Sequence, residues 1–155
     1  MAVIPKVVLN TDLNEGFCFG CGQNNPMGLK LRFTRDGETI RAEFKPDKMH
    51  QGWPGLLHGG ILGCLLDEAM SNIAYATGNT CVTASFEIRQ RQPVRVEVPL
   101  VITAWITRQR KKIIETAGRV TLKDGTIIAE STAKQFIAEN RAGQGDKVKE
   151  TRRHV

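Results

Sequence analysis

The sequence predicts an α+β domain in which one long helix packs against about six antiparallel strands. The first observation is the segment 57–78 (LHGGILGCLLDEAMSNIAYATG), whose apolar residues recur at helical spacing. The second is the stretch 82–89, where apolar and polar residues alternate as in a half-buried strand. The third is a set of further strand-like segments separated by turn signals. A chain of 155 residues is ordinarily one domain, and we expect a single domain over residues 1–138.

The expected helix is opened by His58-Gly59-Gly60 and closed by Gly78-Asn79, because glycine and asparagine tolerate the left-handed conformation that ends helices. Its predicted apolar face consists of Ile61, Leu62, Leu65, Leu66, Ala69, Ile73 and Ala76. The opposite face, centred on Asp67, carries small residues, namely Gly60, Gly63, Cys64, Ser71 and Ala74. Such a face permits close approach by another backbone or by a ligand.

Two adjacent acids, Asp67 and Glu68, lie on this helix without a local counter-charge, since no Lys or Arg occurs between Lys48 and Arg89. Burial would raise the pKa of such a carboxyl, which suits a general base or nucleophile. The alternatives are a solvated helix edge or an ion pair with an arginine distant in sequence. The pattern by itself leaves these readings open.

Strands are also expected on both sides of the helix. Residues 29–33 and 40–44 alternate apolar and polar around Asp36-Gly37, which predicts a hairpin. In the strand after the helix, the even positions 82–88 are expected to face the core and the odd positions 83–89 to face outward. Three more strands are predicted at residues 98–110, 112–123 and 126–138, and the polar composition of 139–155 predicts a flexible or loosely docked tail.

Composition narrows the possible environment and partners. The N-terminus lacks the pattern of a signal peptide and no apolar run reaches membrane-spanning length, so we expect a cytoplasmic protein with no membrane partner. The net charge of +6 is compatible with nucleic acid, a membrane surface or a polyanionic small molecule. Because no zinc-finger pattern or aromatic-rich RNA motif is present, we expect no nucleic-acid partner.

The pair Cys18 and Cys21, spaced as CxxC, supplies half of a zinc site. No second pair of this kind occurs, so the sequence favours a structural turn that packs Phe17 or Phe19 onto the body, with no metal. A redox role is weaker still, because the pair precedes a predicted hairpin and not a helix of thioredoxin type.

Three motifs carry a family resemblance. The run from His50 to Gly55 (HQGWPG), followed by His58-Gly59-Gly60 and by residues 65–70 (LLDEAM), resembles the hotdog-fold acyl-CoA thioesterases of the phenylacetate-pathway and 4-hydroxybenzoyl-CoA types. The upstream segments CFGCG (18–22) and NPMGL (25–29) are similar to a stretch found in many of these bacterial proteins. The resemblance covers residues 17–137 and implies a curved antiparallel sheet wrapped around the central helix.

The resemblance also implies roles for particular residues. Asp67 corresponds to the catalytic carboxylate, and the N–H groups of Gly59 and Gly60 correspond to the oxyanion site, which the positive end of a helix dipole would support. His58 is included with this group and is expected mainly to fix the helix start. Some relatives supply a polar residue at position 83 from a partner subunit. The substrate-binding candidates are Gln51, Gly63, Ser71, Thr83, Arg89 and Arg91.

The expected activity is hydrolysis of a medium-chain or aromatic acyl-CoA to the free acid and CoA. Asp67 would act as general base on water or as nucleophile, and the sequence leaves both open. No cofactor is expected beyond the CoA of the substrate, and the resemblance implies a homodimer or homotetramer. Two alternatives are a dehydratase or hydratase of hotdog type, which would pair His58 with an acid, and an acyl-CoA sensor without turnover.

Overall fold

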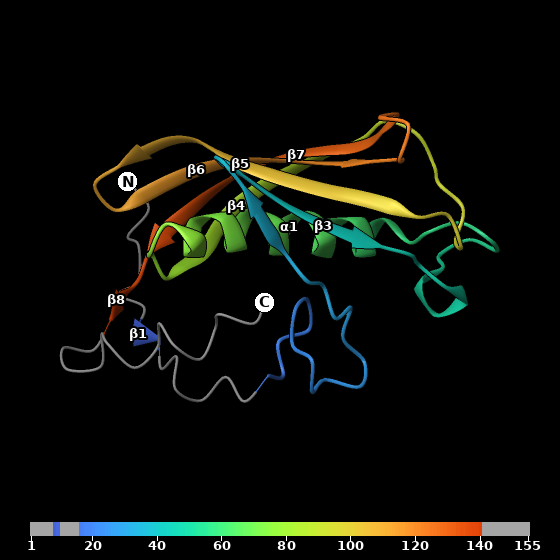
Figure 1. Ribbon diagram of the computed structural model, residues 1–155, viewed down its shortest axis with the longest axis horizontal. Coiled ribbons are helices and arrows are strands. Elements are labelled where there is room, and N and C mark those ends of the chain that lie inside the picture. Colours follow the sequence, from blue (N-terminus) through green and yellow to red (C-terminus); the bar gives the residue numbers. More distant parts are fainter. Residues whose placement is uncertain (1–7, 10–15, 141–155) are drawn as a thin grey trace.

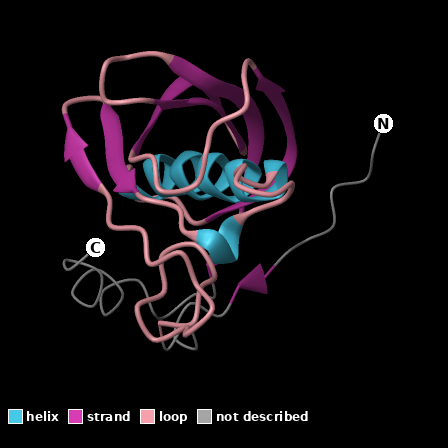
Figure 2. Ribbon diagram, turned by 90° about the vertical axis from the view of Figure 1, so that its right-hand side faces the viewer, coloured by secondary structure: helices cyan, strands magenta, loops and turns pink. Residues whose placement is uncertain are grey.

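The computed structural model describes residues 8–9 and 16–140. Six strands form one antiparallel sheet in the order β2-β3-β5-β6-β7-β4. This sheet curves around α1, the single α-helix of the described residues, so that the helix lies inside it (Figures 1 and 2). The strands are β2 (Thr34–Asp36), β3 (Thr39–Phe44), β4 (Cys81–Gln90), β5 (Leu100–Arg110), β6 (Ile113–Thr121) and β7 (Ile127–Ile137), with the 3₁₀ turn η2 (Lys48–His50) and helix α1 (Gly59–Ala76) between β3 and β4.

The central helix confirms the predicted fold class and its place in the sequence. Its N-cap is His58, its C-cap is Thr77, and Gly78 follows with a left-handed φ of 89°. The buried face is broader than predicted, since Gly63, Met70 and Ala74 are buried as well, whereas Ala76 is exposed. The reason is the curvature of the sheet, which brings β3 to β7 against several sides of the helix.

The predicted hairpin is shorter on its first side. On this side β3 pairs only with the three residues of β2, and residues 29–33 do not join the sheet. Their apolar side chains are buried in alternation as expected, but the backbone N–H of Leu29 donates to Phe19 O (2.8 Å) and that of Leu31 donates to Gly20 O (2.9 Å). Alternation of apolar and polar residues shows that one face of a segment is buried, but it does not show which backbone the segment pairs with. Here that partner is a loop earlier in the chain. We call residues 16–33 the N-terminal loop; Figure 1 shows it below the helix, at the start of the sheet.

Strand β4 departs from the predicted alternation. A bulge shifts its register between Thr83 and Ser85. Beyond the bulge Phe86 and Ile88 approach the helix at Gly63, while before it Thr83 also reaches the helix. An odd-numbered residue therefore lies on the same face as two even-numbered ones, because an extra residue in a strand reverses the side on which later side chains point.

The ends of the domain meet in a second, very short sheet. Strand β1 (Val8–Leu9) pairs in parallel with β8 (Glu139–Asn140). The predicted tail therefore begins with two residues of strand, and its remainder, 141–155, lies outside the described residues. Among the described residues, no helix combines the length and the apolar character needed to cross a bilayer.

Candidate active site

Asp67 stands at the middle of α1 and its carboxylate faces β4. The Thr83 hydroxyl donates to Asp67 Oδ1 at 2.7 Å, a length typical of a charge-assisted bond. Ser71, one helical turn further on, lies 3.4 Å from the same hydroxyl. Both Asp67 and Thr83 are half-buried, so the carboxylate is oriented by the protein and still accessible from outside. In the described part of the chain no Lys, Arg or His pairs with Asp67.

Thr83 makes this contact within one chain. The resemblance implied a polar residue arriving from a partner subunit, but the bulge in β4 turns the Thr83 side chain of the same chain towards α1. The carboxylate is therefore already held in a single subunit.

Gln135 on β7 is a further polar residue beside Thr83 and Ser71, and the sequence analysis did not predict it. It pairs with Thr83 across the sheet and its Nε2 reaches Ser71 Oγ at 3.5 Å. The side chain is fully buried, and its Oε1 has no hydrogen-bond partner among the described residues. Its signal in the sequence was present, because Ser131, Ala133 and Gln135 occupy the inward positions of β7 and an amide on such a face is unusual.

The helix start is shaped by His58. Its Nδ1 accepts from the Gly60 N–H at 2.8 Å, so the imidazole is the N-cap and one of the two expected oxyanion donors is already engaged. The Gly59 N–H has no acceptor among the described residues. A side chain at Gly59 would place Cβ 2.6 Å from the Gln90 amide nitrogen, so the Gln90 side chain would have to move to make room for it.

The loop before the helix is held by its own polar groups. Gln51 Oε1 accepts from the Gly55 N–H at 3.1 Å, and His50 O accepts from the His58 N–H at 2.9 Å. Gln51 thus supports the loop that delivers the helix N-terminus. Trp53 in this loop is 81% exposed.

Gly63 lies under the helix-facing side chains of β4. A Cβ at this position would be 3.1 Å from Ile88 Cδ1 and 4.0 Å from the Phe86 ring. The Phe86 side chain is 46% exposed, whereas Met70 on the helix is completely buried. The accessible apolar surface beside Asp67 is therefore provided by β4 and not by the helix methionine.

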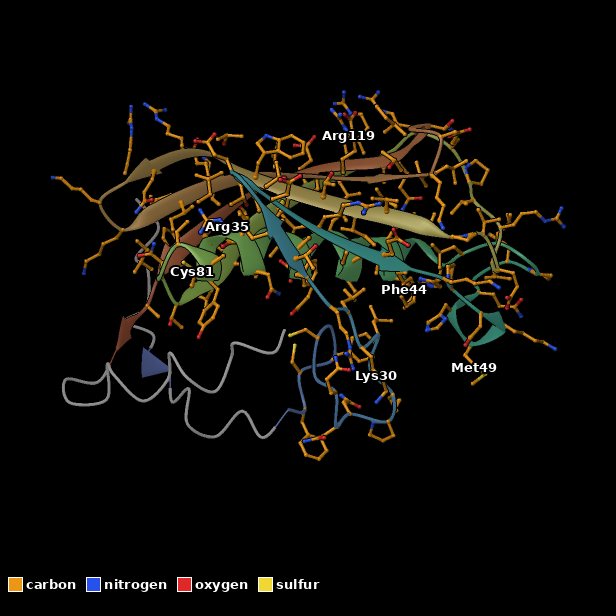
Figure 3. The ribbon with its side chains drawn as sticks, in the orientation of Figure 1. Lys30, Arg35, Phe44, Met49, Cys81 and Arg119 are labelled. Carbon is orange, nitrogen blue, oxygen red and sulfur yellow. The ribbon has the colours of Figure 1, made fainter. Side chains whose placement is uncertain are left out.

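Arg89 and Arg91 do not meet Asp67. Arg89 is paired across the sheet with Glu130, and Glu130 with Arg119, and residues paired in this way share a face. Figure 3 shows Arg119 on the outer surface of the sheet, away from α1. Arg91 donates to Glu130 at 2.7 Å and Arg119 donates to the same carboxylate at 3.1 Å. The hydrogen bond from Arg91 is the main cause that lowers the pKa of Glu130, and the hydrogen bond from Arg119 lowers it further.

The CxxC pair forms the expected turn, in which the Gly22 N–H donates to Cys18 O at 2.9 Å. The expected aromatic anchor is wrong, because Phe17 is 57% and Phe19 is 42% exposed. What the turn packs against is Glu68, whose two carboxylate oxygens each lie 3.6 Å from Cys18 Sγ.

The pKa values of Cys18, Cys21 and Glu68 are shifted from their usual ranges. A hydrogen bond from the Cys21 thiol, together with backbone N–H groups of Cys21 and Gly20, lowers the pKa of Cys18 to about 5, and the bond to Cys18 raises the pKa of Cys21. Burial raises the pKa of Glu68, to which Asn72 donates at 2.9 Å.

Comparison with known proteins agrees with this architecture. Residues 54–129 match the Thioesterase superfamily. The acyl-coenzyme A thioesterase THEM4 of Bos taurus is 25% identical over 131 residues, which are 83% of this chain and 54% of that protein. The chain thus spans about half the length of this relative.

Two solved structures share the fold at low sequence identity. The PaaI protein of the E. coli phenylacetic acid degradation operon has a TM-score of 0.67 at 18% identity, with 72% of this chain and 81% of that chain covered. A hypothetical thioesterase of Streptococcus pneumoniae, crystallised with coenzyme A, has a TM-score of 0.65 at 18% identity, with 69% of this chain and 87% of that chain covered.

A single helix enclosed by a six-stranded antiparallel sheet, with a carboxylate at the middle of the helix, defines a domain of the hotdog class. The match over residues 54–129 identifies this part of the chain as a thioesterase superfamily domain.

Proposed function

We propose that this protein hydrolyses acyl-CoA thioesters, with Asp67 as the catalytic carboxylate. The observation that carries the proposal is the half-buried carboxylate held by Thr83 at 2.7 Å without a cationic partner in the described chain. A structural carboxylate is usually neutralised by an ion pair, whereas a base or nucleophile needs an unblocked oxygen. Asp67 Oδ2 accepts no hydrogen bond from another described residue.

The proposed reaction begins at that oxygen. Asp67 either takes a proton from water, whose oxygen then attacks the thioester carbonyl, or attacks the carbonyl directly to give a mixed anhydride that water hydrolyses. In both routes the C–S bond breaks, CoA leaves as a thiolate that is protonated, and the acyl group leaves as the free acid. The Gly59 N–H and the positive end of α1 would stabilise the developing oxyanion.

The known proteins support both the substrate and the residue pair. Besides the protein crystallised with coenzyme A, a Streptococcus mutans protein of the same fold was solved bound to acetyl CoA, with a TM-score of 0.66 at 16% identity. Variants of the Streptococcus pneumoniae protein replace one aspartate and one threonine, sixteen positions apart, by alanine. Asp67 and Thr83 have the same spacing of 16.

The acyl group is proposed to be medium-chain or aromatic. The exposed part of the Phe86 ring, the half-buried Cys64 and the small Gly63 together offer an apolar surface beside Asp67. An acyl chain that covers such a surface gains roughly 25 cal/mol per Å², which acetyl is too small to gain.

The proposed phosphate contacts are Arg89 and Arg91, as the sequence suggested. Arg91 is already neutralised in part by Glu130, so Arg89 is the more available of the two, since among the described residues its salt bridge is the long one to Glu87 at 4.0 Å. Both lie on the face of the sheet opposite Asp67, and because β4 is an edge strand, a long substrate could reach both faces around that edge.

We also propose that the protein forms a homodimer or homotetramer, because β4 lies at the edge of the sheet. The edge strand β4 is exposed from Ala84 to Glu87, Phe86 included, and an unpaired apolar edge is a surface that proteins normally cover. In the homo-oligomer that the family resemblance implies, a second copy of this chain would cover that edge. Sedimentation of the full chain tests this, and a stable, active monomer would count against it.

The decisive experiment is turnover of acyl-CoA by wild type and by Asp67→Asn. Loss of turnover with retained folding supports hydrolysis, while wild-type protein that binds acyl-CoA without releasing CoA would instead identify a sensor. A hotdog dehydratase would use His58 as its base. In this structure Nδ1 of His58 accepts from the Gly60 N–H and caps the helix.

A further inference from the structure

The structure brings a third metal-binding group to the CxxC pair. Glu68 follows Cys18 by 50 residues in the sequence, yet one ligand atom from each of Cys18, Cys21 and Glu68 lies within 4.8 Å of the others. Sequence reasoning set the pair aside because only half of a zinc site was visible. The missing partner is a carboxylate on the central helix, which no local pattern identifies.

The distances fit a zinc ion. In a tetrahedral site with Zn–S of about 2.3 Å and Zn–O of about 2.0–2.2 Å, sulfur and oxygen ligands lie roughly 3.5–3.7 Å apart. Cys18 Sγ lies 3.6 Å from each oxygen of Glu68. Both cysteines are free thiols, so no disulfide occupies the position.

The N-terminal loop is shaped around this cluster. A Cβ at Gly20 would be 2.5 Å from the Glu68 carboxylate, and a Cβ at Gly22 would be 2.4 Å from the backbone N of Cys18. At Gly22 the contact is with backbone atoms, so a side chain at that position would prevent this turn.

The carboxylate is oriented as a ligand would be. Asn72 Nδ2, one turn beyond Glu68, donates to Oε1 at 2.9 Å and to the Glu68 backbone carbonyl at 2.9 Å. No Lys or Arg of the described residues forms an ion pair with Glu68. Two thiols and one carboxylate thus meet in a partly buried place without an ion-pair partner among the described residues, and these are groups that a divalent metal can bind.

We propose that Cys18, Cys21 and Glu68 bind one Zn²⁺ ion, with a solvent molecule as fourth ligand, and that the ion fastens the N-terminal loop to α1. Two thiolates select zinc over magnesium or calcium, which prefer oxygen ligands. The role is structural: Asp67 points to β4 and Glu68 to the loop, so the metal lies beside the catalytic carboxylate and not in its path. The assignment does not depend on the proposed hydrolysis.

The test uses the full chain, reduced and stripped with a chelator, and titrated with Zn²⁺ alone. We expect one zinc per chain by elemental analysis and a higher melting temperature when zinc is bound. Replacement by Co²⁺ should give a thiolate-to-cobalt charge-transfer band and the strong visible bands of a tetrahedral site. Wild type that retains no zinc after desalting, or that forms a Cys18–Cys21 disulfide under the same conditions and excludes zinc, would overturn the proposal.

Variants identify the ligands. Cys18→Ser and Glu68→Gln should each weaken zinc affinity by more than about 100-fold, because even loss of an outer hydrogen bond to a ligand costs about 10–100-fold. Cys81→Ser, which removes a half-buried thiol on β4, is the matched control and should leave affinity unchanged. Glu68→Gln is nearly isosteric and protects the test against misfolding. Unchanged affinity in that variant would remove the carboxylate from the site and refute the assignment.

Discussion

Replacing Asp67 by asparagine tests the proposed chemistry with little change in shape. The amide oxygen of asparagine can still accept from Thr83, which lies 2.7 Å from Asp67 Oδ1. The change converts a charge-assisted hydrogen bond into a neutral one, which costs stability on the order of 1 kcal/mol. The amide can neither accept a proton from water nor attack a carbonyl. We therefore expect folded protein with a large loss of kcat.

The expected loss follows from what a positioned base contributes. General base catalysis is worth about 10²–10⁴-fold, or about 2.7–5.4 kcal/mol of activation free energy. KM should change much less than kcat, because the carboxylate would act in the transition state and contribute little to holding the substrate.

The assay is CoA release from octanoyl-CoA and phenylacetyl-CoA at fixed pH, with circular dichroism to verify folding. Asp36→Asn is the matched control, since Asp36 is an exposed acid of the β2 turn. An Asp67→Asn enzyme within about tenfold of wild type, below the range for a lost base, would refute the assignment of the catalytic carboxylate.

Three further predictions concern the acyl surface, the helix cap and the outer face. Phe86→Ala should lower kcat/KM for octanoyl-CoA about tenfold and for acetyl-CoA much less, because only the longer chain covers the ring. His58→Ala should lower the melting temperature by about 1–8 °C, since the Gly60 N–H loses its cap, and His58→Asn should restore it. Arg91 holds the pKa of Glu130 below its usual 4.5, so this pair stabilises the fold above pH 4.5 and less as the pH falls further; Glu130→Gln should remove that acid-side loss in a melting curve measured against pH.

Each of these has a clear contrary result. An unchanged chain-length profile in Phe86→Ala would place the acyl group elsewhere. A His58→Asn protein that is stable but inactive would make the imidazole catalytic and not structural. For Glu130→Gln, the control is Glu38→Gln in the exposed hairpin turn, and an equal effect of the two would show that Glu130 is not specifically paired.

Much of the candidate site was predictable because its parts are local in sequence. Spacing at 100° per residue identified the helix and placed Asp67 among small side chains, and His58-Gly59-Gly60 identified its start. Thr83 was proposed from the family resemblance, but the alternation of β4 assigned it to the outward face. The bulge that brings it to Asp67 depends on how β4 pairs with β7, which no local pattern reports.

The sequence by itself determined the fold class, the helix and the positions of most strands along the chain, because periodicity and turn chemistry act over a few residues. Only the tertiary structure decided which distant groups meet. It placed Gln135 under Ser71, put Arg91 against Glu130 on the outer face, and brought Glu68 to the two cysteines. Such meetings depend on the curvature of the sheet around α1 and on the path of the N-terminal loop, and these are properties of the folded chain as a whole.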